Sequence, residues 1–454
     1  MIWLFLYYYS IIYFNEDYVQ FNADTYGQKE KTMLNVLIKN AKVYCDNKFV
    51  QADMLIENGT VSSVGADIAV CDGVSVIDAK NMLILPGFAD VHVHLREPGF
   101  FYKESIETGT KAAARGGFTL VCSMPNLNPV PDSPEHIAQQ LAAIKDSAVI
   151  EVLPYAAITV GRAGKQLCDF AALKGSCFAL TDDGSGVQSD EMMLEAMKLA
   201  VEQDMMIAAH CEDNSLLRGG YIHDGNYCRE HGHKGICSES EWGQIARDLK
   251  LAEQTGCRYH VCHISTKESV AIIREAKKRG VKVTCETGPH YLTLCDADLQ
   301  EDGRFKMNPP LRAAEDMQAL IEGIKDGTID VIATDHAPHS AEEKSKGLAG
   351  SAMGVVGIET AFPVLYTKLV RPGIISLELL LSLMSESPRK TFGLAGGMVE
   401  GAAADLCLID LNKKYTINPD QFISKGHSTP FEGWEVWGDV IMTLKDGQIV
   451  WKQK

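Results

Sequence analysis

The chain has 454 residues, of which 46% are hydrophobic and 23% charged, a composition typical of a globular protein with one barrel-sized domain and a smaller one. The formal net charge of −17 argues against a nucleic-acid-binding surface, because a polyanion would be repelled over most of it. Thirteen cysteines without a Cys-x-x-Cys pair indicate neither a disulfide framework nor a zinc ribbon, and they favour reduced thiols in the cytoplasm.

The first 32 residues differ in character from the rest of the chain. Residues 1–14 are apolar and aromatic, but they lack the basic start of a signal peptide and are too short to cross a bilayer. Residues 15–32 are polar and without pattern, and a strand pattern begins at Met33. We therefore expect Met33 to be the natural start and residues 1–32 to be a non-native or disordered extension, with a membrane tether as the alternative.

Short strands and turns occupy both ends of the remaining chain. Four apolar runs of strand length are found there, at 37–44, 52–61, 404–411 and 440–450. Asn58-Gly59 within the second run is a strong signal for a tight hairpin turn. We expect residues 33–85 and 396–454 to form one small β-sandwich domain that is built from both termini.

Apolar strands alternate with amphipathic segments in the middle of the chain, residues 86–395. Eight strands are predicted, at 82–94, 118–124, 149–158, 176–182, 205–211, 258–264, 281–287 and 330–335. Apolar residues follow helical spacing at 191–200 and 269–278. This alternation predicts an α/β fold, a (β/α)8 TIM barrel, with a doubly wound open sheet as the alternative. Barrel enzymes carry their chemistry at the carboxyl ends of the strands, so potential ligands are expected there.

His92 and His94 lie at the end of the first predicted barrel strand. Successive strand side chains point to opposite faces, so these two project to the same side, about 6.6 Å apart. Two neutral imidazoles at that spacing can bind one metal ion, and a pair of half-buried strand histidines is the plain alternative. Arg96 follows before Pro98-Gly99 ends the strand, and it is expected at the mouth of the site.

Histidine or aspartate also lies at the ends of four further predicted strands: Asp182 and Asp183 at the end of the fourth, His210 of the fifth, His263 of the sixth and Asp335 of the eighth. Singly, each has an ordinary explanation as a core histidine, a helix cap or a turn residue. Together they favour a metal site. Nitrogen and carboxylate ligands without thiolate suit Zn²⁺, with Mn²⁺, Co²⁺ and Fe²⁺ as alternatives. The ligands suffice for two metals that share a carboxylate, and Asp335 is placed to move a proton.

Six stretches occur in a fixed order along the chain: Asp90-Val91-His92-Val93-His94-Leu95-Arg96-Glu97-Pro98-Gly99, Met124-Pro125-Asn126, His210-Cys211-Glu212-Asp213, His263-Ile264-Ser265-Thr266, Lys306-Met307-Asn308-Pro309-Pro310-Leu311-Arg312 and Asp335-His336-Ala337-Pro338-His339. From about Met33 to the C-terminus the chain resembles the dihydroorotases of the bacterial long-chain type (class I), in the amidohydrolase superfamily. The resemblance implies one or two Zn²⁺ ions bound by His92, His94, Asp183, His210, His263 and Asp335. It makes Asp183 the bridging ligand, although spacing alone leaves Asp182 open.

The implied reaction is the reversible cyclisation of N-carbamoyl-L-aspartate to L-dihydroorotate in pyrimidine biosynthesis, with Asp335 as the catalytic residue. Superfamily members that cleave hydantoins, dihydropyrimidines or allantoin usually carry a carboxylated lysine on the fourth strand. Residues 177–183 contain no lysine, and Lys174 precedes the strand, which disfavours those substrates. Another cyclic amidase, or a non-catalytic assembly partner of aspartate transcarbamoylase, is the alternative.

L-dihydroorotate and N-carbamoyl-L-aspartate both carry an α-carboxylate. A guanidinium can bind such a carboxylate with two parallel hydrogen bonds, and Arg96 is positioned for this. The resemblance implies substrate contacts by Arg96, Asn126, Asn308, His339 and the backbone of Gly354. Asn126 and Asn308 are alternatively turn residues near prolines, and residues 342–354 have the composition of either a mobile lid or a solvated loop.

Two neighbouring residues are left out of the predicted site. Arg312 either contacts substrate or pairs on the surface, and His336 is expected to point away. The expected partner is a small-molecule substrate, with no nucleic acid and no membrane. A homodimer and an association with aspartate transcarbamoylase are left open by the sequence.

Overall fold

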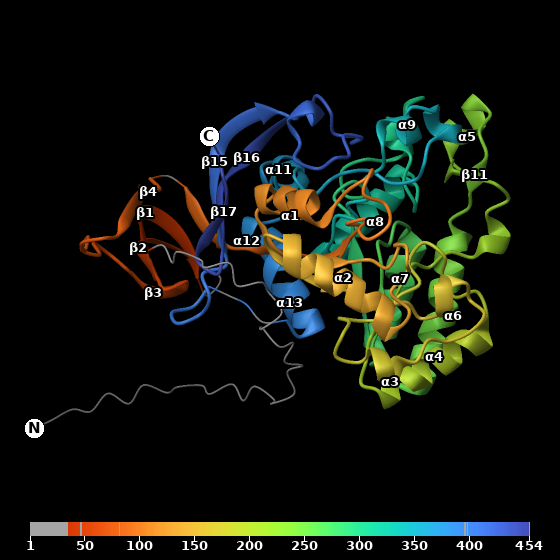
Figure 1. The fold of residues 1–454 in the computed structure, drawn as a ribbon. Coiled ribbons are helices and arrows are strands. Elements are labelled where there is room, and N and C mark those ends of the chain that lie inside the picture. Colours follow the sequence, from red (N-terminus) through yellow and green to blue (C-terminus); the bar gives the residue numbers. More distant parts are fainter. Residues whose placement is uncertain (1–34, 46–47, 81, 395, 397, 454) are drawn as a thin grey trace, which may run out of the picture.

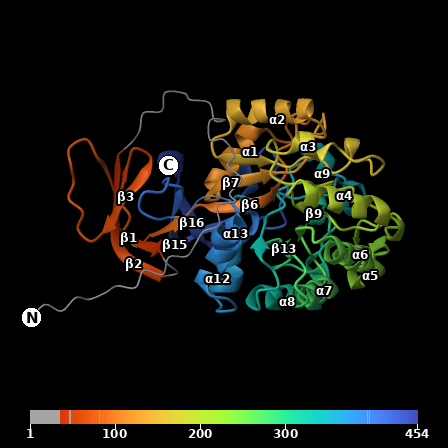
Figure 2. The same cartoon turned by 90° about the horizontal axis from the view of Figure 1, so that it is seen from below.

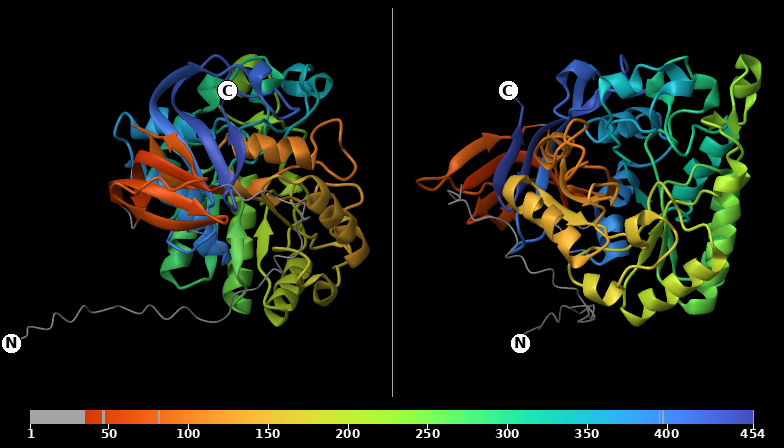
Figure 3. Two further views of the ribbon diagram at one scale, coloured as in Figure 1. Left: turned by 60° about the vertical axis from the view of Figure 1, so that its left-hand side comes forward. Right: turned by 45° about the vertical axis from the view of Figure 1, so that its right-hand side comes forward.

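The computed structural model describes residues 35–45, 48–80, 82–394, 396 and 398–453. The expectations for residues 1–32 and for a start at Met33 therefore lie outside the described residues. Strands from the two ends of the chain form a β domain on one side, and a barrel with its helices forms the larger body beside it (Figure 1). Figure 3 shows this side-by-side arrangement from two further directions.

The β domain is one mixed sheet in the order β17-β16-β15-β5-β1-β2-β3, with β4 paired to β1. Its strands are β1 (Val36–Cys45), β2 (Lys48–Glu57), β3 (Thr60–Gly65), β4 (Ser75–Asp78), β5 (Leu83–Pro86), β15 (Leu406–Thr416), β16 (Glu435–Lys445) and β17 (Gln448–Lys452). Asn58 and Gly59 turn between β2 and β3 with φ of 51° and 82°, as the hairpin signal predicts. Ile84 of β5 lies opposite Leu408 of β15, so the two chain ends share one apolar core, as expected.

The barrel is a ring of parallel strands (Figure 2). One part contains β6 (Phe88–Val93), β7 (Phe118–Ser123) and β8 (Glu151–Pro154); the other contains β9 (Ile207–Ala209), β12 (Tyr259–Val261), β13 (Val283–Thr287) and β14 (Val331–Ile332). Parallel bridges from Leu180 to Ala156 and to Ile207 join the parts, and a bridge between Val93 and His336 closes the ring. The expected (β/α)8 barrel is confirmed.

Most of the observed barrel strands are shorter than predicted, and two of the predicted strands differ in more than their bounds. The apolar run 82–94 divides at Gly87, where β5 joins the β domain and β6 enters the barrel. The chain crosses β7 closely there, because a Cβ at Gly87 would lie 2.3 Å from the Thr119 side chain. The predicted strand 176–182 is reduced to bridges at Leu180, although Thr181 still donates to the Ala156 carbonyl at 2.9 Å.

Helices cover the outside of the barrel, and their bounds are α1 (Ile106–Arg115), α2 (Pro134–Ser147), α3 (Phe170–Leu173), α4 (Asp190–Glu202), α6 (Glu239–Thr255), α7 (Lys267–Lys278), α8 (Ala314–Lys325), α11 (Ala361–Leu365), α12 (Leu377–Leu381) and α13 (Ser387–Phe392). The predicted helices 191–200 and 269–278 are α4 and α7. Ser189 and Thr266 cap their first turns by accepting backbone N–H bonds.

A further group of short elements lies at one end of the barrel: β10 (Ile222–His223), α5 (Asn226–His231), β11 (Gly235–Ile236), α9 (Ala341–Lys344) and α10 (Gly347–Gly350). Within the described part of the chain, no helix combines the length and the apolar character needed to cross a membrane.

Candidate active site

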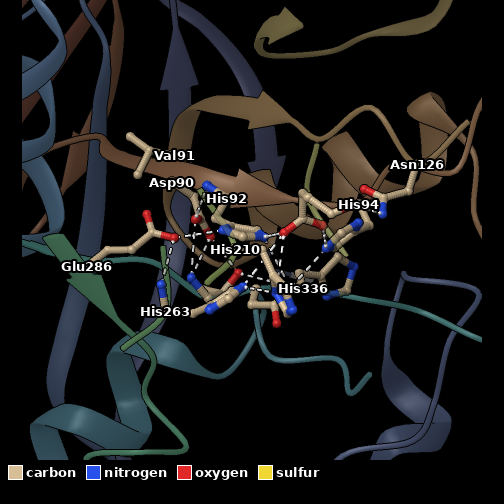
Figure 4. A network of polar contacts seen from close by, with 12 residues as sticks. Asp90, Val91, His92, His94, Asn126, His210, His263, Glu286 and His336 are labelled. Atoms are coloured by element: carbon tan, nitrogen blue, oxygen red, sulfur yellow. Dashed lines mark hydrogen bonds and ion pairs between the residues drawn. The ribbon is translucent and has the colours of Figure 1, made fainter. Parts of the chain in front are cut away.

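The side chains predicted to bind metal meet at the carboxyl ends of the barrel strands (Figure 4). All six are buried, and they come from five strand ends of the ring: His92 in β6 and His94 directly after it, Asp183 after the Leu180 segment, His210 after β9, His263 after β12 and Asp335 after β14. The barrel therefore brings together every ligand that the sequence predicted.

The potential ligand atoms form two adjoining groups. In one, Asp335 Oδ1 lies 2.9 Å from His94 Nε2 and 3.5 Å from His92 Nε2. In the other, Asp183 Oδ1 lies 3.7 Å from His263 Nε2 and 3.9 Å from His210 Nδ1. Ligands of a tetrahedral zinc ion at its usual bond lengths are about 3.3 Å apart. Both groups therefore have the spacing of a metal site.

His92 and Asp183 join the two groups, because His92 Nε2 and Asp183 Oδ1 are 3.5 Å apart. Both atoms are buried, and neither has a hydrogen-bond partner among the residues that the structure describes. His92 Nδ1 is 2.6 Å from Glu286 Oε1, so the neutral form of His92, the form that binds a metal, donates its Nδ1–H to this carboxylate and has a free lone pair on Nε2. Buried polar atoms normally have partners, so two facing acceptors without one fit a cation between them.

Glu286 in β13 is a part of the site that the sequence analysis missed. Its second oxygen, Oε2, lies 3.2 Å from His260 Nε2, and its Oε1 also accepts the His263 backbone N–H at 3.3 Å. It is fully buried. The available signal was a single charged residue in a mostly buried strand, since a buried carboxylate needs a partner.

Negative charge dominates this interior. Burial lowers the pKa of His92, but Glu286, Asp335 and Asp183 raise it well above its usual value. Burial raises the pKa of Asp335, yet His92 and His94 lower it to about 2. The pKa of Asp183 is likewise held well below its usual value, against burial, by His263 and His92. Asp335, Asp183 and Glu286 thus place three ionised carboxylates in one buried cluster, and this concentration of negative charge favours a bound cation.

Asp182 and Asp183 have different surroundings. Asp182 Oδ1 accepts the backbone N–H groups of Ile158 and Thr159 at 2.9 and 3.0 Å, and its Oδ2 bonds to the Thr159 hydroxyl. Asp182 thus holds the loop after β8, whereas Asp183 faces the histidines. The geometry favours Asp183 as the bridging ligand.

Arg96 and His339 lie together beside the cluster. Arg96 adopts a left-handed backbone conformation with φ of 61°, and its Nε donates to the Pro338 carbonyl at 3.2 Å. Its Nη2 is 3.4 Å from His339 Nε2. Burial lowers the pKa of Arg96 to about 10, so the guanidinium stays charged at neutral pH.

Asn126 and Asn308 lie close to the ligands on two sides. Asn126 donates to the Asp183 carbonyl at 3.0 Å, and Asn308 donates to Glu212 at 3.1 Å. The Oδ1 atom of each is buried and has no hydrogen-bond partner in the described part of the chain. Glu212, which the sequence analysis did not assign, also lies 3.5 Å from His210 Nε2 and so connects Asn308 with a predicted ligand.

Gly354 packs directly against His339. A Cβ at this position would lie 3.1 Å from His339 Cδ2, and φ is 133°, so the position requires glycine. Its N–H donates to the Lys306 carbonyl at 3.1 Å. Its carbonyl accepts from Lys344 Nζ at 2.7 Å, and this buried ammonium also donates to the carbonyls of Ala352 and Lys306.

The two residues that were left out are placed as follows. Arg312 is buried and donates to Ser265 Oγ at 3.1 Å and to the Ile236 carbonyl at 3.0 Å, so pairing on the surface is wrong. His336 Nε2 lies 3.6 Å from Glu104, and its Nδ1 accepts the Gly357 N–H at 3.4 Å, away from the metal ligands, as expected.

Comparisons with known proteins agree with this geometry. A family model described as dihydro-orotase-like matches residues 81–269. A dihydroorotase of Bacillus cereus is 52% identical over 425 residues, which cover 93% of this chain and 99% of that protein. The chain belongs to the dihydroorotase family. A second relative in the family, from Bacillus cytotoxicus, is 51% identical with the same coverage.

Solved structures of the wider superfamily share the fold. An L-hydantoinase (dihydropyrimidinase) from Arthrobacter aurescens has a TM-score of 0.82 at 26% identity, covering 92% of this chain and 96% of that one. A dihydropyrimidinase from Brevibacillus agri has a TM-score of 0.80 at 26% identity, with 92% and 95% coverage. The resemblance noted from the motifs is thus confirmed at the level of family and fold.

Proposed function

We propose that this chain catalyses the reversible cyclisation of N-carbamoyl-L-aspartate to L-dihydroorotate and water, as a step of pyrimidine biosynthesis. One observation carries the proposal: a buried cluster with the spacing of a metal site lies directly beside the Arg96–His339 pair. Such a site can act on an amide whose neighbouring group is a carboxylate. Membership of the dihydroorotase family supports the same reaction.

We propose one or two Zn²⁺ ions as the cofactor. His92, His94 and Asp335 would hold one ion, and Asp183, His210 and His263 would hold the other, with Asp183 between the two. When bound, such ions polarise an amide carbonyl and make water a competent nucleophile near neutral pH. Behind these residues, Glu286 accepts from His92 Nδ1 and so favours the neutral tautomer of His92 whose Nε2 is free to bind metal.

Asp335 is proposed as the residue that moves the proton. Its carboxylate is ionised in the folded chain and lies 2.9 Å from His94 Nε2 and 3.5 Å from Nε2 of His92, the histidine that faces the second ligand group. In hydrolysis it accepts a proton from the attacking water and delivers it to the departing ring nitrogen. In ring closure it takes a proton from the ureido nitrogen and returns it to the leaving water.

Arg96 is proposed to bind the substrate carboxylate, together with His339. Arg96 donates from Nε to the Pro338 carbonyl at 3.2 Å, and its Nη2 lies 3.4 Å from His339 Nε2, so the outer edge of the guanidinium can bind a carboxylate. Asn126 and Asn308 each use one amide group within the protein and have an unpartnered Oδ1 that can accept from a ureido N–H. Gly354 lies next to this pocket and shapes its wall.

Other cyclic amides are the second candidate, because the similar solved structures include hydantoinases. The aspartate at position 183, in a segment without lysine, argues against the carboxylated lysine that those relatives usually carry. A non-catalytic assembly role is disfavoured, since every predicted ligand is present. A homodimer, an association with aspartate transcarbamoylase and a cytoplasmic location stay predictions from the sequence.

The proposal is tested by measuring zinc per chain and cyclisation of N-carbamoyl-L-aspartate on the same sample. We expect turnover that is abolished by chelation and restored by added Zn²⁺. Full metal occupancy without turnover would contradict the proposal and favour an assembly role.

A further inference from the structure

Lys344 ends the short helix α9, in the loop that runs from His339 to Gly354 beside the proposed site. The residue is buried, with 6% of its surface exposed. Its Nζ donates to three backbone carbonyls, those of Gly354 at 2.7 Å, Ala352 at 2.8 Å and Lys306 at 3.0 Å. An ammonium has three N–H donors, so these carbonyls use all of them.

The three carbonyls belong to two different segments of the chain. Ala352 and Gly354 lie in the same loop as Lys344, whereas Lys306 lies two residues before Asn308. The Lys306 carbonyl also accepts the Gly354 N–H at 3.1 Å, and Lys306 Nζ in turn donates to a carbonyl of α10 at 2.9 Å. Each segment therefore holds the other through a buried lysine.

The contacts of Lys344 fix the direction of the backbone beside His339. The carbonyls of Ala352 and Gly354 both face the ammonium, while the Met353 carbonyl between them accepts from His339 Nε2 at 2.8 Å. A carbonyl turns only together with its planar peptide group. Lys344 thus holds the peptide groups on both sides of the one that binds His339.

This arrangement requires the charged form of Lys344. A neutral amine has two donors, and its lone pair would face the third carbonyl and repel it. Burial, together with the charge of Lys306, lowers the pKa of Lys344 to about 7, and Asp302 acts in the opposite direction. The ammonium is therefore present below about pH 7 and is lost as the pH rises through that value.

The charged and titratable groups that face this ammonium are those of Lys306, Asp302 and His339. Burial lowers the pKa of His339 to about 3, so this ring stays neutral from pH 6.5 to 9. Lys344 is thus the group in this loop whose charge changes near neutral pH.

We propose that Lys344 is a positioning residue whose ammonium joins the loop of His339 and Gly354 to the segment of Asn308, and so holds the wall of the substrate pocket in place. It acts through the backbone and does not itself touch the substrate. This inference rests on the proposed function, since it concerns the same pocket.

Lys344→Met tests this role, because it removes the ammonium and keeps a side chain of similar length. We expect KM for hydrolysis of L-dihydroorotate to rise about tenfold at pH 6.5, through the loss of hydrogen bonds from a charged donor. The reacting atoms are not touched, so kcat and zinc content should stay within about threefold. At pH 9 the wild type has lost most of its own ammonium, and the ratio of the two KM values should fall to about twofold or less.

Hydrogen exchange gives a second readout, which needs no turnover. The N–H groups of Gly354 and Ala352 donate to the carbonyls of Lys306 and Glu343. In Lys344→Met at pH 6.5 we expect exchange in residues 340–354 to be about tenfold faster, with α4 and α7 unchanged. Should the variant fail to fold, the wild type alone decides: its exchange in residues 340–354, corrected for the intrinsic effect of pH, must rise between pH 6.5 and 9.

Lys425→Met is the matched control. Lys425 Nζ also donates to a loop carbonyl, that of Phe101 at 2.8 Å, but the residue is exposed. We expect this substitution to leave both KM and the exchange of residues 340–354 unchanged at pH 6.5 and at pH 9.

Two results would overturn the inference. The first is a wild-type KM in zinc-loaded Lys344→Met at pH 6.5, and the second is a KM ratio that is the same at both pH values, which would mean that Lys344 contributes packing alone. An active wild type with either result refutes the inference and leaves the proposed function standing. A zinc-loaded wild type that does not process L-dihydroorotate refutes the proposed function, and hydrogen exchange then decides whether Lys344 joins the two segments.

Discussion

Replacing Glu286 by glutamine tests whether its carboxylate orients the proposed metal ligand His92. The wild-type carboxylate accepts from His92 Nδ1 at 2.6 Å and from His260 Nε2 at 3.2 Å. A glutamine has one accepting oxygen, so its NH₂ group must face one of these two nitrogens. If it faces His92, the histidine proton moves to Nε2 and the lone pair proposed to bind metal is lost.

We expect zinc affinity to fall about 10- to 100-fold, or about 1.4–2.8 kcal/mol in binding free energy. This is the usual contribution of about one hydrogen bond to a charged group. Zinc affinity is measured by competition with a chelator of known strength, and kcat is then measured at saturating zinc. We expect kcat at saturation to fall less than about tenfold, since Glu286 is not placed against the reacting atoms.

Asp248→Asn is the matched control for this substitution. Asp248 is equally buried, but it accepts from Tyr259 Oη at 2.6 Å and pairs with Arg247. We expect the Asp248→Asn substitution to lower the melting temperature and to change the zinc affinity by less than about threefold. The proposed role of Glu286 in zinc binding is refuted if Glu286→Gln binds zinc as tightly as wild type. It is also refuted if Asp248→Asn loses as much zinc affinity as Glu286→Gln.

Three further substitutions probe the proton carrier, the carboxylate pocket and the loop behind it. Asp335→Asn is expected to lower kcat by roughly 10²–10⁴-fold with zinc retained, and near-normal turnover would remove Asp335 from proton transfer. Arg96→Lys is expected to raise KM for L-dihydroorotate about 10- to 100-fold, because an ammonium cannot grip a carboxylate with two parallel bonds; an unchanged KM would place the carboxylate elsewhere. Burial raises the pKa of Glu104, but His336 and Ser424 hold it below the usual 4.5, so its ionised form contributes stability above that pH and loses it as the pH falls. The difference in melting temperature between wild type and Glu104→Gln should therefore shrink as the pH falls below about 4.5; a constant difference would contradict this assignment.

The sequence predicted the barrel and the ligands for a physical reason. Strand and helix periods are local, and parallel strands bring their carboxyl ends to one edge, so residues as far apart as His92 and Asp335 could be placed together. The same argument could not separate Asp182 from Asp183, because adjacent residues share one strand end. Only the hydrogen bonds of Asp182 to Ile158 and Thr159 distinguish them.

The supporting residues were not predicted, because their roles depend on contacts between distant segments. Glu286 is 194 positions from His92, and Lys344 is 38 positions from Lys306. The sequence around a single buried glutamate or loop lysine does not indicate which distant residue it contacts. The division of strand 82–94 at Gly87 was missed for a related reason, since an apolar run does not show that its two halves join different sheets.

The most direct test of the central claim compares kcat/KM of the zinc-loaded chain for L-dihydroorotate, hydantoin, dihydrouracil and allantoin. Of the four compounds, only L-dihydroorotate carries a carboxylate that the Arg96–His339 pocket can bind. We therefore expect its kcat/KM to be at least about 100-fold higher than that of the others, which corresponds to the free energy of two hydrogen bonds to charged groups. Equal or greater kcat/KM for one of the neutral rings would contradict the account.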